Sequence, residues 1–389
     1  MKIRFIFFYF ILLTAVILPQ NTSELSPSTE AEHFLEGAKV YDIKQTDDLI
    51  LVATYGDGVF AYDKAEGKWT SYSTKNNTIE NDFFYCIASS KDYIWAGSSE
   101  GLFTYDKKKD QWTKRSFALG GQFGNWIRAL KYDPNENTLW IGRFRNITRL
   151  DVAKKKFTDY DRTQKNDAKS NTILSIELDG DSLIWFGTES GVHKLNKRMN
   201  PDNADAWTYL NNRDGGFLDE GDAVAVGDMM QEGNYIWFGT EEFVTPEKPK
   251  FNVGGVYRFD HKSAWDRISK QNGLTSNGVY SLERTGNYVW ASLYWFDRND
   301  KQEYGKGLVL INRFNGVVKP LDLNLTNINT SNIFSLYFDG KDMWIGTDNG
   351  LWRLPVVNPL AKWTATKEEK QKDQTKAPIK KKPTKKKKK

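Results

Sequence analysis

Residues 331–354 read SNIFSLYFDGKDMWIGTDNGLWRL and contain three short apolar runs separated by two tight turns, the second of which is centred on a glycine. The rest of the chain repeats this unit. Aligning it on the Trp of IWIGT gives seven copies, spaced 43 to 54 residues apart, with the matching positions Val52, Trp95, Trp140, Trp185, Trp237, Trp290 and Trp344. A repeat of this length with several short strands is typical of a β-propeller, because no single blade can bury both of its faces.

The first copy shows how many strands each unit holds. Alternating apolar and polar residues at 40–45, 49–54, 59–63 and 69–72 predict four strands joined by short polar turns. We therefore expect an all-β fold at residues 39–366, a seven-bladed propeller of four-stranded antiparallel blades. The segment 362–364 reads KWT, as in outer strands of other copies, and predicts that the last blade is completed at the C-terminal end.

The two ends of the chain do not follow the repeat. Residues 1–20 place Lys2 and Arg4 before an apolar run, the layout of a secretory signal, and the run is also compatible with an uncleaved anchor. Residues 21–38 are Ser, Thr and Glu-rich and predict a linker. We expect an exported protein, periplasmic or secreted, which an uncleaved segment would hold at the membrane. We expect a monomer.

The segment 367–389 is strongly basic. It holds 12 Lys and three acidic residues, a net charge of +9, whereas the whole chain has +5, so the remainder carries −4. Such a run cannot bury a core and predicts a disordered polybasic tail that binds an anionic surface. Aromatic residues are absent from the run, which argues against specific nucleic-acid readout. A tail that only aids solubility is the alternative.

The lead-in segments carry a family resemblance. GLTSNGVYSL at 273–282 and NTSNIFSL at 329–336, each followed by a Trp-containing strand and a Gly-Leu strand, resemble the two-component regulator propeller repeat over residues 40–364. The resemblance implies an exported propeller related to ligand-sensing domains that often recognise carbohydrate. It does not imply signalling within this chain, which has no kinase, receiver or second set of blades.

Motifs for catalysis, cofactors or metals are missing. His33, His193 and His261 stand at no metal-ligand spacing, and no hydrolase, metalloprotease or phosphate-loop signature occurs. We therefore expect no catalytic residue, no cofactor and no metal, although carboxylate pairs formed only in the fold stay open. The single cysteine, Cys86, excludes an internal disulfide and fits a small buried hydrophobe.

Departures from the repeat are where a propeller usually places binding groups, because rigid scaffolds present function on irregular loops. The connection between second and third strands is lengthened in the fifth and sixth copies, and the third copy carries two arginines in its short turn. Loops at 120–126 and 214–222 should lie on the same face. We predict the binding residues Trp126, Arg143, Arg145, Phe243, Tyr294, Trp295, Phe296 and Asp297, with Trp295 as the main anchor.

The aromatic side chains suit stacking on a sugar ring or docking of a partner's apolar side chains, and the arginines suit a carboxylate or sulfate. Mutual packing of the two inserts is the alternative. Three functional hypotheses follow. The first is a binding module for a glycan or a protein, which would act in trans as a sensor-like component. The second is an envelope scaffold tethered by its basic tail. The third is a propeller-type polysaccharide lyase or hydrolase.

Overall fold

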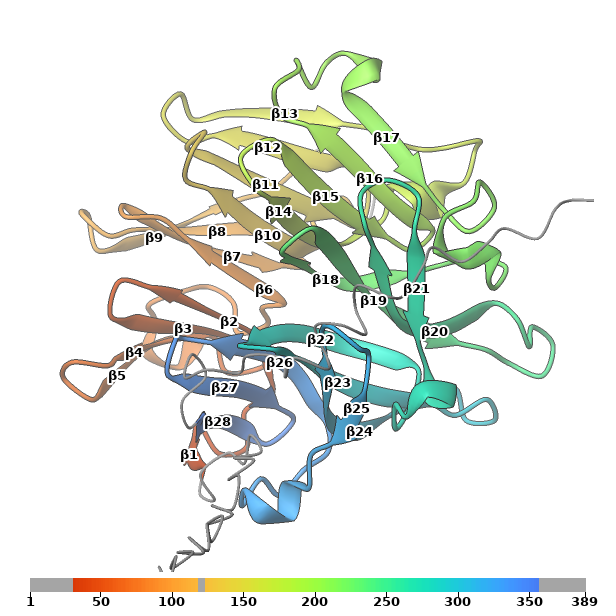
Figure 1. Cartoon of the computed structure of the whole chain (residues 1–389). Helices are drawn as coiled ribbons and strands as arrows, with labels where there is room; N and C mark the ends of the chain where they lie inside the picture. The colour runs from red at the N-terminus through yellow and green to blue at the C-terminus, as the bar shows by residue number, and fades with distance from the viewer. Residues whose placement is uncertain (1–30, 118–122, 357–389) are drawn as a thin grey trace, which may run out of the picture.

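The computed structural model describes residues 31–117 and 123–356, which form seven four-stranded antiparallel sheets around a central axis (Figure 1). The predicted signal or anchor, the basic tail and residues 362–364 lie outside the described residues. The predicted all-β propeller of four-stranded blades is confirmed.

In six of the seven sheets, the four strands follow one another along the chain from the axis outward. The first three sheets are β2 (Val40–Thr46), β3 (Leu49–Thr54), β4 (Val59–Asp63) and β5 (Lys68–Tyr72); β6 (Cys86–Ser89), β7 (Tyr93–Ser98), β8 (Gly101–Asp106) and β9 (Gln111–Arg115); and β10 (Ile127–Asp133), β11 (Thr138–Arg143), β12 (Ile147–Asp151) and β13 (Lys156–Tyr160).

The next three sheets have the same order. They are β14 (Ile173–Asp179), β15 (Leu183–Thr188), β16 (Gly191–Asn196) and β17 (Trp207–Leu210); β18 (Val226–Glu232), β19 (Tyr235–Phe243), β20 (Asn252–Phe259) and β21 (Trp265–Ile268); and β22 (Gly278–Thr285), β23 (Tyr288–Phe296), β24 (Glu303–Asn312) and β25 (Val318–Pro320).

The seventh sheet combines both ends of the described chain. Its strands, from the axis outward, are β26 (Ile333–Phe338), β27 (Asp342–Thr347), β28 (Gly350–Pro355) and β1 (Glu32–Phe34). Single turns of 3-10 helix lie in the connections, namely η1 (Thr74–Asn76), η3 (Ala168–Asn171), η4 (Ala204–Ala206), η5 (Phe217–Asp219), η6 (Lys270–Asn272) and η7 (Leu323–Leu325).

The repeated tryptophans form the contacts between blades. All six of those in second strands expose at most 1% of their surface. In the fourth blade, Trp185 packs into the same cluster as Phe238 of the fifth blade, and its indole nitrogen donates to the Asp179 carboxylate at 2.8 Å. The ring of Trp185 buries much apolar surface between two sheets, and its one polar atom is satisfied by the last residue of β14.

The ring is closed by the N-terminal segment. β1 pairs antiparallel with β28, and the two strands lie side by side in Figure 1. Since β1 takes the free edge of β28, the prediction that residues 362–364 supply the outer strand is wrong. Residues 32–34 likewise belong to the fold and not to a linker. Their sequence, EHF, lacks the Trp-Thr signature of the other outer strands, so only the pairing identifies them.

Two aromatic side chains fix β1 in place. The His33 ring stacks on Trp352 with 3.9 Å between ring centres and 6° between planes. Phe34 lies 6.0 Å from the ring of Trp344 and 5.7 Å from that of Trp69 in the first blade. Phe34 therefore joins the last blade to the first.

We predict that Phe34→Ala lowers the free energy of unfolding by about 2 kcal/mol, because it removes a half-buried ring at the closure. Urea denaturation checks this value. Phe83→Ala is the matched control, since Phe83 is 46% exposed and should change stability little. Equal effects of the two substitutions would contradict a structural role for β1.

Candidate functional site

The inner strands of the seven sheets surround a central cavity of about 290 Å³, which runs along the propeller axis. We call the end at which the inner strands begin the channel mouth; it is lined by Tyr41, Tyr85, Arg128, Tyr280 and Phe334. In a four-stranded antiparallel blade, the turn between second and third strands and the loop from the preceding blade reach this same end. The channel mouth is therefore on the face that the sequence analysis selected.

A β-bulge adds one residue near the mouth in six of the seven inner strands. In β22 the register with β23 shifts between Val279 and Ser281, so Tyr280 is the extra residue. A bulge bends the strand locally and redirects a side chain. The same shift occurs in five other blades, where the extra residues are Tyr41, Arg128, Leu174, Gly227 and Phe334, all of them in the cavity wall.

Aromatic rings cover one half of the mouth. The ring of Tyr41 lies 5.1 Å from that of Phe334, which lies 5.4 Å from Tyr280. On the other side, Tyr41 lies 6.1 Å from Tyr85, and Tyr85 lies 5.7 Å from Trp126. We call these five residues the aromatic arc. They come from five neighbouring blades, so only the closed ring brings them together.

Three carboxylates of the fourth to sixth blades lie beside residues of the mouth, although none of them is in the cavity wall. Glu189, in the turn after β15, forms an ion pair with Arg128 at 3.3 Å. Glu303, at the start of β24, accepts a hydrogen bond of 2.9 Å from the Tyr280 hydroxyl. Glu241 of β19 lies near the charges of Arg128 and Glu303, and both charges act on its pKa. We call Glu189, Glu241 and Glu303 the acidic half of the mouth.

The partly buried side chain of Glu241 lies beside Gly227 of the neighbouring strand. A β-carbon built on Gly227 would make ordinary contact with it, 3.9 Å from Oε1. Burial raises the pKa of Glu241 to about 7, Arg128 opposes this shift, and the charge of Glu303 adds to it. Among the described residues, no hydrogen bond or ion pair of this carboxylate is present.

Deeper in the channel, the charges are mostly paired. Lys131 contacts Glu177 at 2.6 Å, and Lys44 contacts Asp42 at 2.9 Å. Asp228 instead accepts backbone N–H groups, including that of Leu282 in the next blade at 2.7 Å. Burial raises the pKa of Asp228 to about 6. The contacts of Lys131 and Asp228 tie neighbouring inner strands to each other, so we assign this part of the channel a structural role.

Metal binding finds no support in the described ranges 31–117 and 123–356, where no group of three His, Cys, Asp or Glu side chains could hold an ion. His193 is buried and its Nε2 lies 2.8 Å from the Ser170 carbonyl. Burial lowers the pKa of His193 to about 4. This histidine therefore stays neutral near pH 7 and is part of the core.

The two inserts form extended hairpins, β19–β20 and β23–β24, that pack on each other. The ring of Phe243 lies 4.5 Å from that of Phe296, and the backbone N–H of Glu242 donates to the Tyr294 hydroxyl at 3.0 Å. A β-carbon on Gly278 would lie 2.5 Å from the Tyr294 ring, so glycine is required there. The alternative that the inserts pack mutually is thus correct for their inner faces.

The eight predicted site residues occupy different environments. Tyr294 and Phe296 are buried, at 1% and 2% exposure, and support the hairpins. Phe243 and Trp295 are 40% and 37% exposed on the hairpins. Asp297 accepts from the Asn299 backbone at 2.7 Å and shapes its own turn.

Of the eight, only Trp126 lies in the aromatic arc. It stacks on Phe144 with 5.5 Å between ring centres and 1° between planes, and the Arg128 guanidinium lies 5.4 Å from its ring centre. It is half-buried. The contact to Phe144 fixes the orientation of the indole at the edge of the mouth.

The predicted pair of turn arginines is separated. Arg143 is fully buried, pairs with Asp159 at 3.0 Å and donates to the Gly124 carbonyl at 2.9 Å. It cannot clamp a carboxylate or sulfate of a ligand, which corrects the prediction for this residue. Arg145 is exposed beside a separate cavity of about 420 Å³ that Asp161 also lines. Arg143 is the last residue of β11, whereas Arg145 lies in the turn that follows, so the alternation of side chains along the strand does not extend to Arg145.

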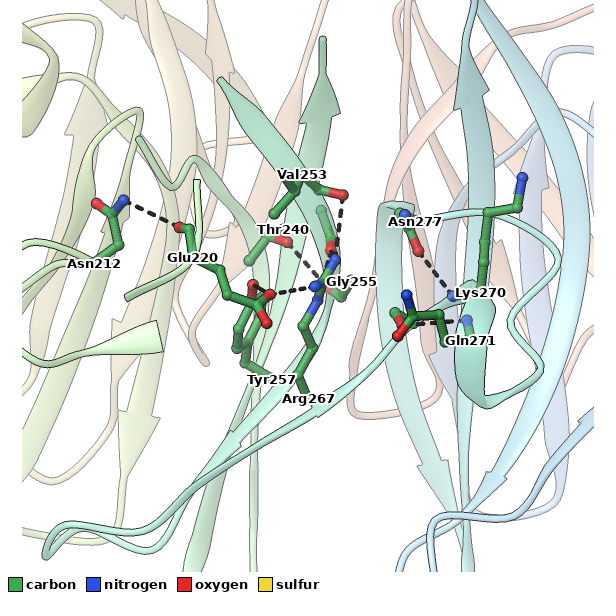
Figure 2. Close-up of polar contacts among 12 residues, drawn as sticks. Asn212, Glu220, Thr240, Val253, Gly255, Tyr257, Arg267, Lys270, Gln271 and Asn277 are labelled. Atoms are coloured by element: carbon green, nitrogen blue, oxygen red, sulfur yellow. Dashed lines mark hydrogen bonds and ion pairs between the residues drawn. The ribbon is translucent and has the colours of Figure 1, made fainter. Parts of the chain in front are cut away.

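The long loop before the fifth blade is also packed. Figure 2 shows its Glu220 between Tyr257 and Arg267; the tyrosine hydroxyl donates to the carboxylate at 3.2 Å, and the arginine forms an ion pair with it. Asn212 donates to the Glu220 carbonyl at 3.1 Å (Figure 2). Phe217 is fully buried. This loop is therefore a structural element of the fifth blade.

Most of the mouth was missed at the level of sequence. Four residues of the mouth occupy one position of the repeat, near the start of the inner strand and 10 or 11 residues before the repeat position of Trp344. They are Tyr41, Tyr85, Tyr280 and Phe334. Comparing that position across the copies would have found them, because four of seven copies carry an aromatic residue there. Glu241 and Glu303 have no such signal, since they lie in inserts of different sequence.

Within the described residues, no helix has the length and apolar character needed to cross a membrane. Neither a family model nor a curated protein matches the sequence. Solved structures do match the fold. Their sequence identity to this chain is below 20%, so the similarity extends to the fold alone.

One similar structure is the extracellular domain of a putative hybrid two-component system from B. thetaiotaomicron, with a TM-score of 0.62 and 19% identity. The match covers 84% of this chain and 40% of the other, so this chain spans about two fifths of that neighbour. Virginiamycin B lyase from Staphylococcus aureus matches with a TM-score of 0.60 and 12% identity, over 84% of this chain and 99% of the lyase.

We predict that Glu241→Gln stabilises the protein at alkaline pH. A carboxyl group whose pKa rises from 4.5 to about 7 on folding opposes folding increasingly as the pH rises between these values. Removing the charge should therefore raise the free energy of unfolding by about 2 kcal/mol at about pH 8.5 and very little at about pH 4.

Denaturant melts across this pH range measure the effect. Glu66→Gln is the control, because Glu66 is exposed and pairs only with exposed Lys68. A gain for Glu241→Gln that does not depend on pH would contradict the buried charge.

Proposed function

We propose that this chain is a non-catalytic, extracytoplasmic binding module that takes the ring of a sugar at the channel mouth and acts as a sensor-like component in trans. The observation that carries the proposal is the aromatic arc at the mouth of the cavity, with carboxylates hydrogen-bonded or ion-paired to the mouth residues Tyr280 and Arg128. Flat aromatic rings offer a surface for the apolar face of a sugar, and carboxylates accept hydrogen bonds from its hydroxyl groups.

The rigidity of the mouth supports this proposal. Tyr280 is held between the Tyr294 ring, 4.3 Å away, and the Glu303 carboxylate. Side chains fixed before a ligand arrives lose little entropy on binding, which favours affinity. The mouth differs in this respect from Trp295, which stands exposed on a hairpin edge with the Lys306 ammonium 5.4 Å from its ring centre.

The fold comparisons agree with the proposed setting. One neighbour is described as an extracellular domain of a two-component system, and the predicted signal or anchor at residues 1–20 is consistent with export. A sugar-sensing domain outside the cytoplasm needs a partner that transmits the signal, so the proposal implies such a partner. Three functions compete with this proposal. They are binding of a protein ligand on the same face, a scaffold role, and lyase or hydrolase activity.

We predict that Tyr41→Ala weakens binding of a glycan at least about tenfold, equal to about 1.4 kcal/mol, because it removes the centre of the aromatic arc. A glycan array followed by calorimetry on each hit measures this. Val317→Ala, which alters a 50% exposed residue in the turn before β25, is the control.

Trp295→Ala, the sequence-predicted anchor, belongs in the same experiment. A loss confined to Trp295→Ala would move the site from the mouth to the hairpins. The absence of any glycan hit would reject sugar binding, and turnover of a hit would favour the lyase or hydrolase.

The basic segment 367–389 supports a second, separate contact. We expect its net charge of +9 to hold the protein on an anionic surface such as membrane phospholipid. Deleting it should abolish salt-sensitive retention on anionic vesicles while leaving the melting temperature and glycan binding unchanged. Equal retention of the full-length and truncated proteins at low salt would contradict this expectation.

A further inference from the structure

Another cavity lies between the second and third blades, which are neighbours in Figure 1. It has a volume of about 290 Å³, and its walls are β7, β8 and β9 on one side and β12 and β13 on the other. We call it the side groove. Its apolar lining consists of Tyr93, Trp95, Leu150, Val152 and Phe157, and none of its residues belongs to the lining of the central cavity.

A short side chain in the second blade leaves this space open. The third-strand residue opposite a repeated tryptophan lies on the same face of the sheet. In four blades it is a Lys or Arg whose charged group lies 5.4 to 5.9 Å from the centre of the tryptophan ring. The four pairs are Trp140–Arg149, Trp185–Lys194, Trp237–Arg258 and Trp344–Arg353. The residue opposite Trp95 is Thr104, which is too short to fill the same space.

The third blade also contributes a smaller side chain at this junction. Four outer strands carry a tryptophan opposite the fifth residue of the third strand, namely Trp69, Trp112, Trp207 and Trp265. The corresponding residue of β13 is Phe157, which packs against the cluster that contains Trp95. The side groove is therefore a feature of this one junction and not of the repeat.

The groove is lined by three cations and one carboxylate. The guanidinium of Arg115 lies over the Phe157 ring, 3.8 Å from its centre, and no carboxylate among the described residues contacts it. Lys155 is exposed in the turn between β12 and β13, and it has no ion pair within residues 31–117 and 123–356. Asp106 pairs with Lys109 at 3.5 Å and accepts the backbone N–H of Lys109 at 3.2 Å. The carboxylate is thus engaged by its own turn.

This combination is complementary to a molecule with an apolar body and an anionic group. Stacking on Phe157 fixes the plane of the Arg115 guanidinium, whose N–H groups suit two parallel hydrogen bonds to a carboxylate or a sulfonate. Half-buried Tyr93, Val152 and Phe157 offer apolar contact beside it. The volume is at the lower end of the range for small-molecule sites, which favours a single small ligand over a long chain.

We infer that the side groove binds a small amphipathic anion, whose apolar ring lies against Val152 and Phe157 and whose carboxylate or sulfonate is bound by Arg115. Lys155 adds electrostatic attraction at the lower rim. This site is separate from the channel mouth, so the inference goes beyond the proposed function and does not depend on sugar binding.

The test compares two fluorescent probes with the full-length protein. Anilinonaphthalene sulfonate carries one negative charge, and phenylnaphthylamine has the same rings without that charge. We expect the sulfonate to bind at least about tenfold more tightly than the neutral probe in fluorescence titrations. Raising the salt concentration should reduce this preference, because the cations of the groove are at the surface.

Variants locate the bound probe. Arg115→Gln should remove most of the preference for the sulfonate. Lys114→Gln is the matched control, because Lys114 is the adjacent residue of β9, faces the other side of the sheet and pairs with Glu100. Thr104→Arg introduces the residue type of the other blades and should prevent both probes from binding in the groove. Melting temperatures check that each variant is folded.

Several outcomes would overturn the inference. They include equal affinity for the two probes and equal effects of Arg115→Gln and Lys114→Gln. Loss of sulfonate binding in Tyr41→Ala, with no loss in Arg115→Gln, would place the probe at the channel mouth. Naphthoate, a carboxylate of similar shape, should displace the sulfonate. Displacement by a peptide of alternating Asp and Leu, but not by naphthoate, would replace the small molecule with a protein partner.

Discussion

Packing of a second-strand tryptophan ring at six of the seven junctions between adjacent sheets is the interaction on which the molecule depends. Trp140, Trp185 and Trp237 are fully buried in this way, and each fills the wedge that opens between neighbouring blades as they diverge from the axis. In a chain with a single cysteine no disulfide can hold the blades together. Burial of these rings must therefore fix the blade angles, and through them the width of the central channel.

Closure by β1 connects this packing to the site. The aromatic arc crosses the junction between the last blade and the first, where Phe334 meets Tyr41 at 5.1 Å. At the outer rim of that junction, Phe34 of β1 lies against Trp344 and Trp69. A ring that opened there would separate the two halves of the arc. The same strand pairing that completes the last sheet thus keeps the centre of the arc together.

The mouth combines features that stabilise the fold with one that opposes it. Tyr280 and Tyr294 stack at 4.3 Å and contribute to the packing of the sixth blade. Glu241, by contrast, is partly buried and has no hydrogen bond or ion pair of its carboxylate among the described residues, and its raised pKa reflects the cost of ionising it there. Groups that reduce stability are commonly found where a protein binds a ligand, because the ligand compensates them.

Repetition in the sequence determined the fold, since Trp185 and its counterparts recur at a spacing that only blades of one kind can produce. The same reasoning placed Trp126 near the binding face but could not tell buried Tyr294 from exposed Trp295, because adjacent strand residues face opposite ways and the partner surface is unknown. Only the closed ring brought Phe334 beside Tyr41, or β1 to β28. Contacts between blades join residues far apart in the chain, and no local pattern encodes the distance at which they meet.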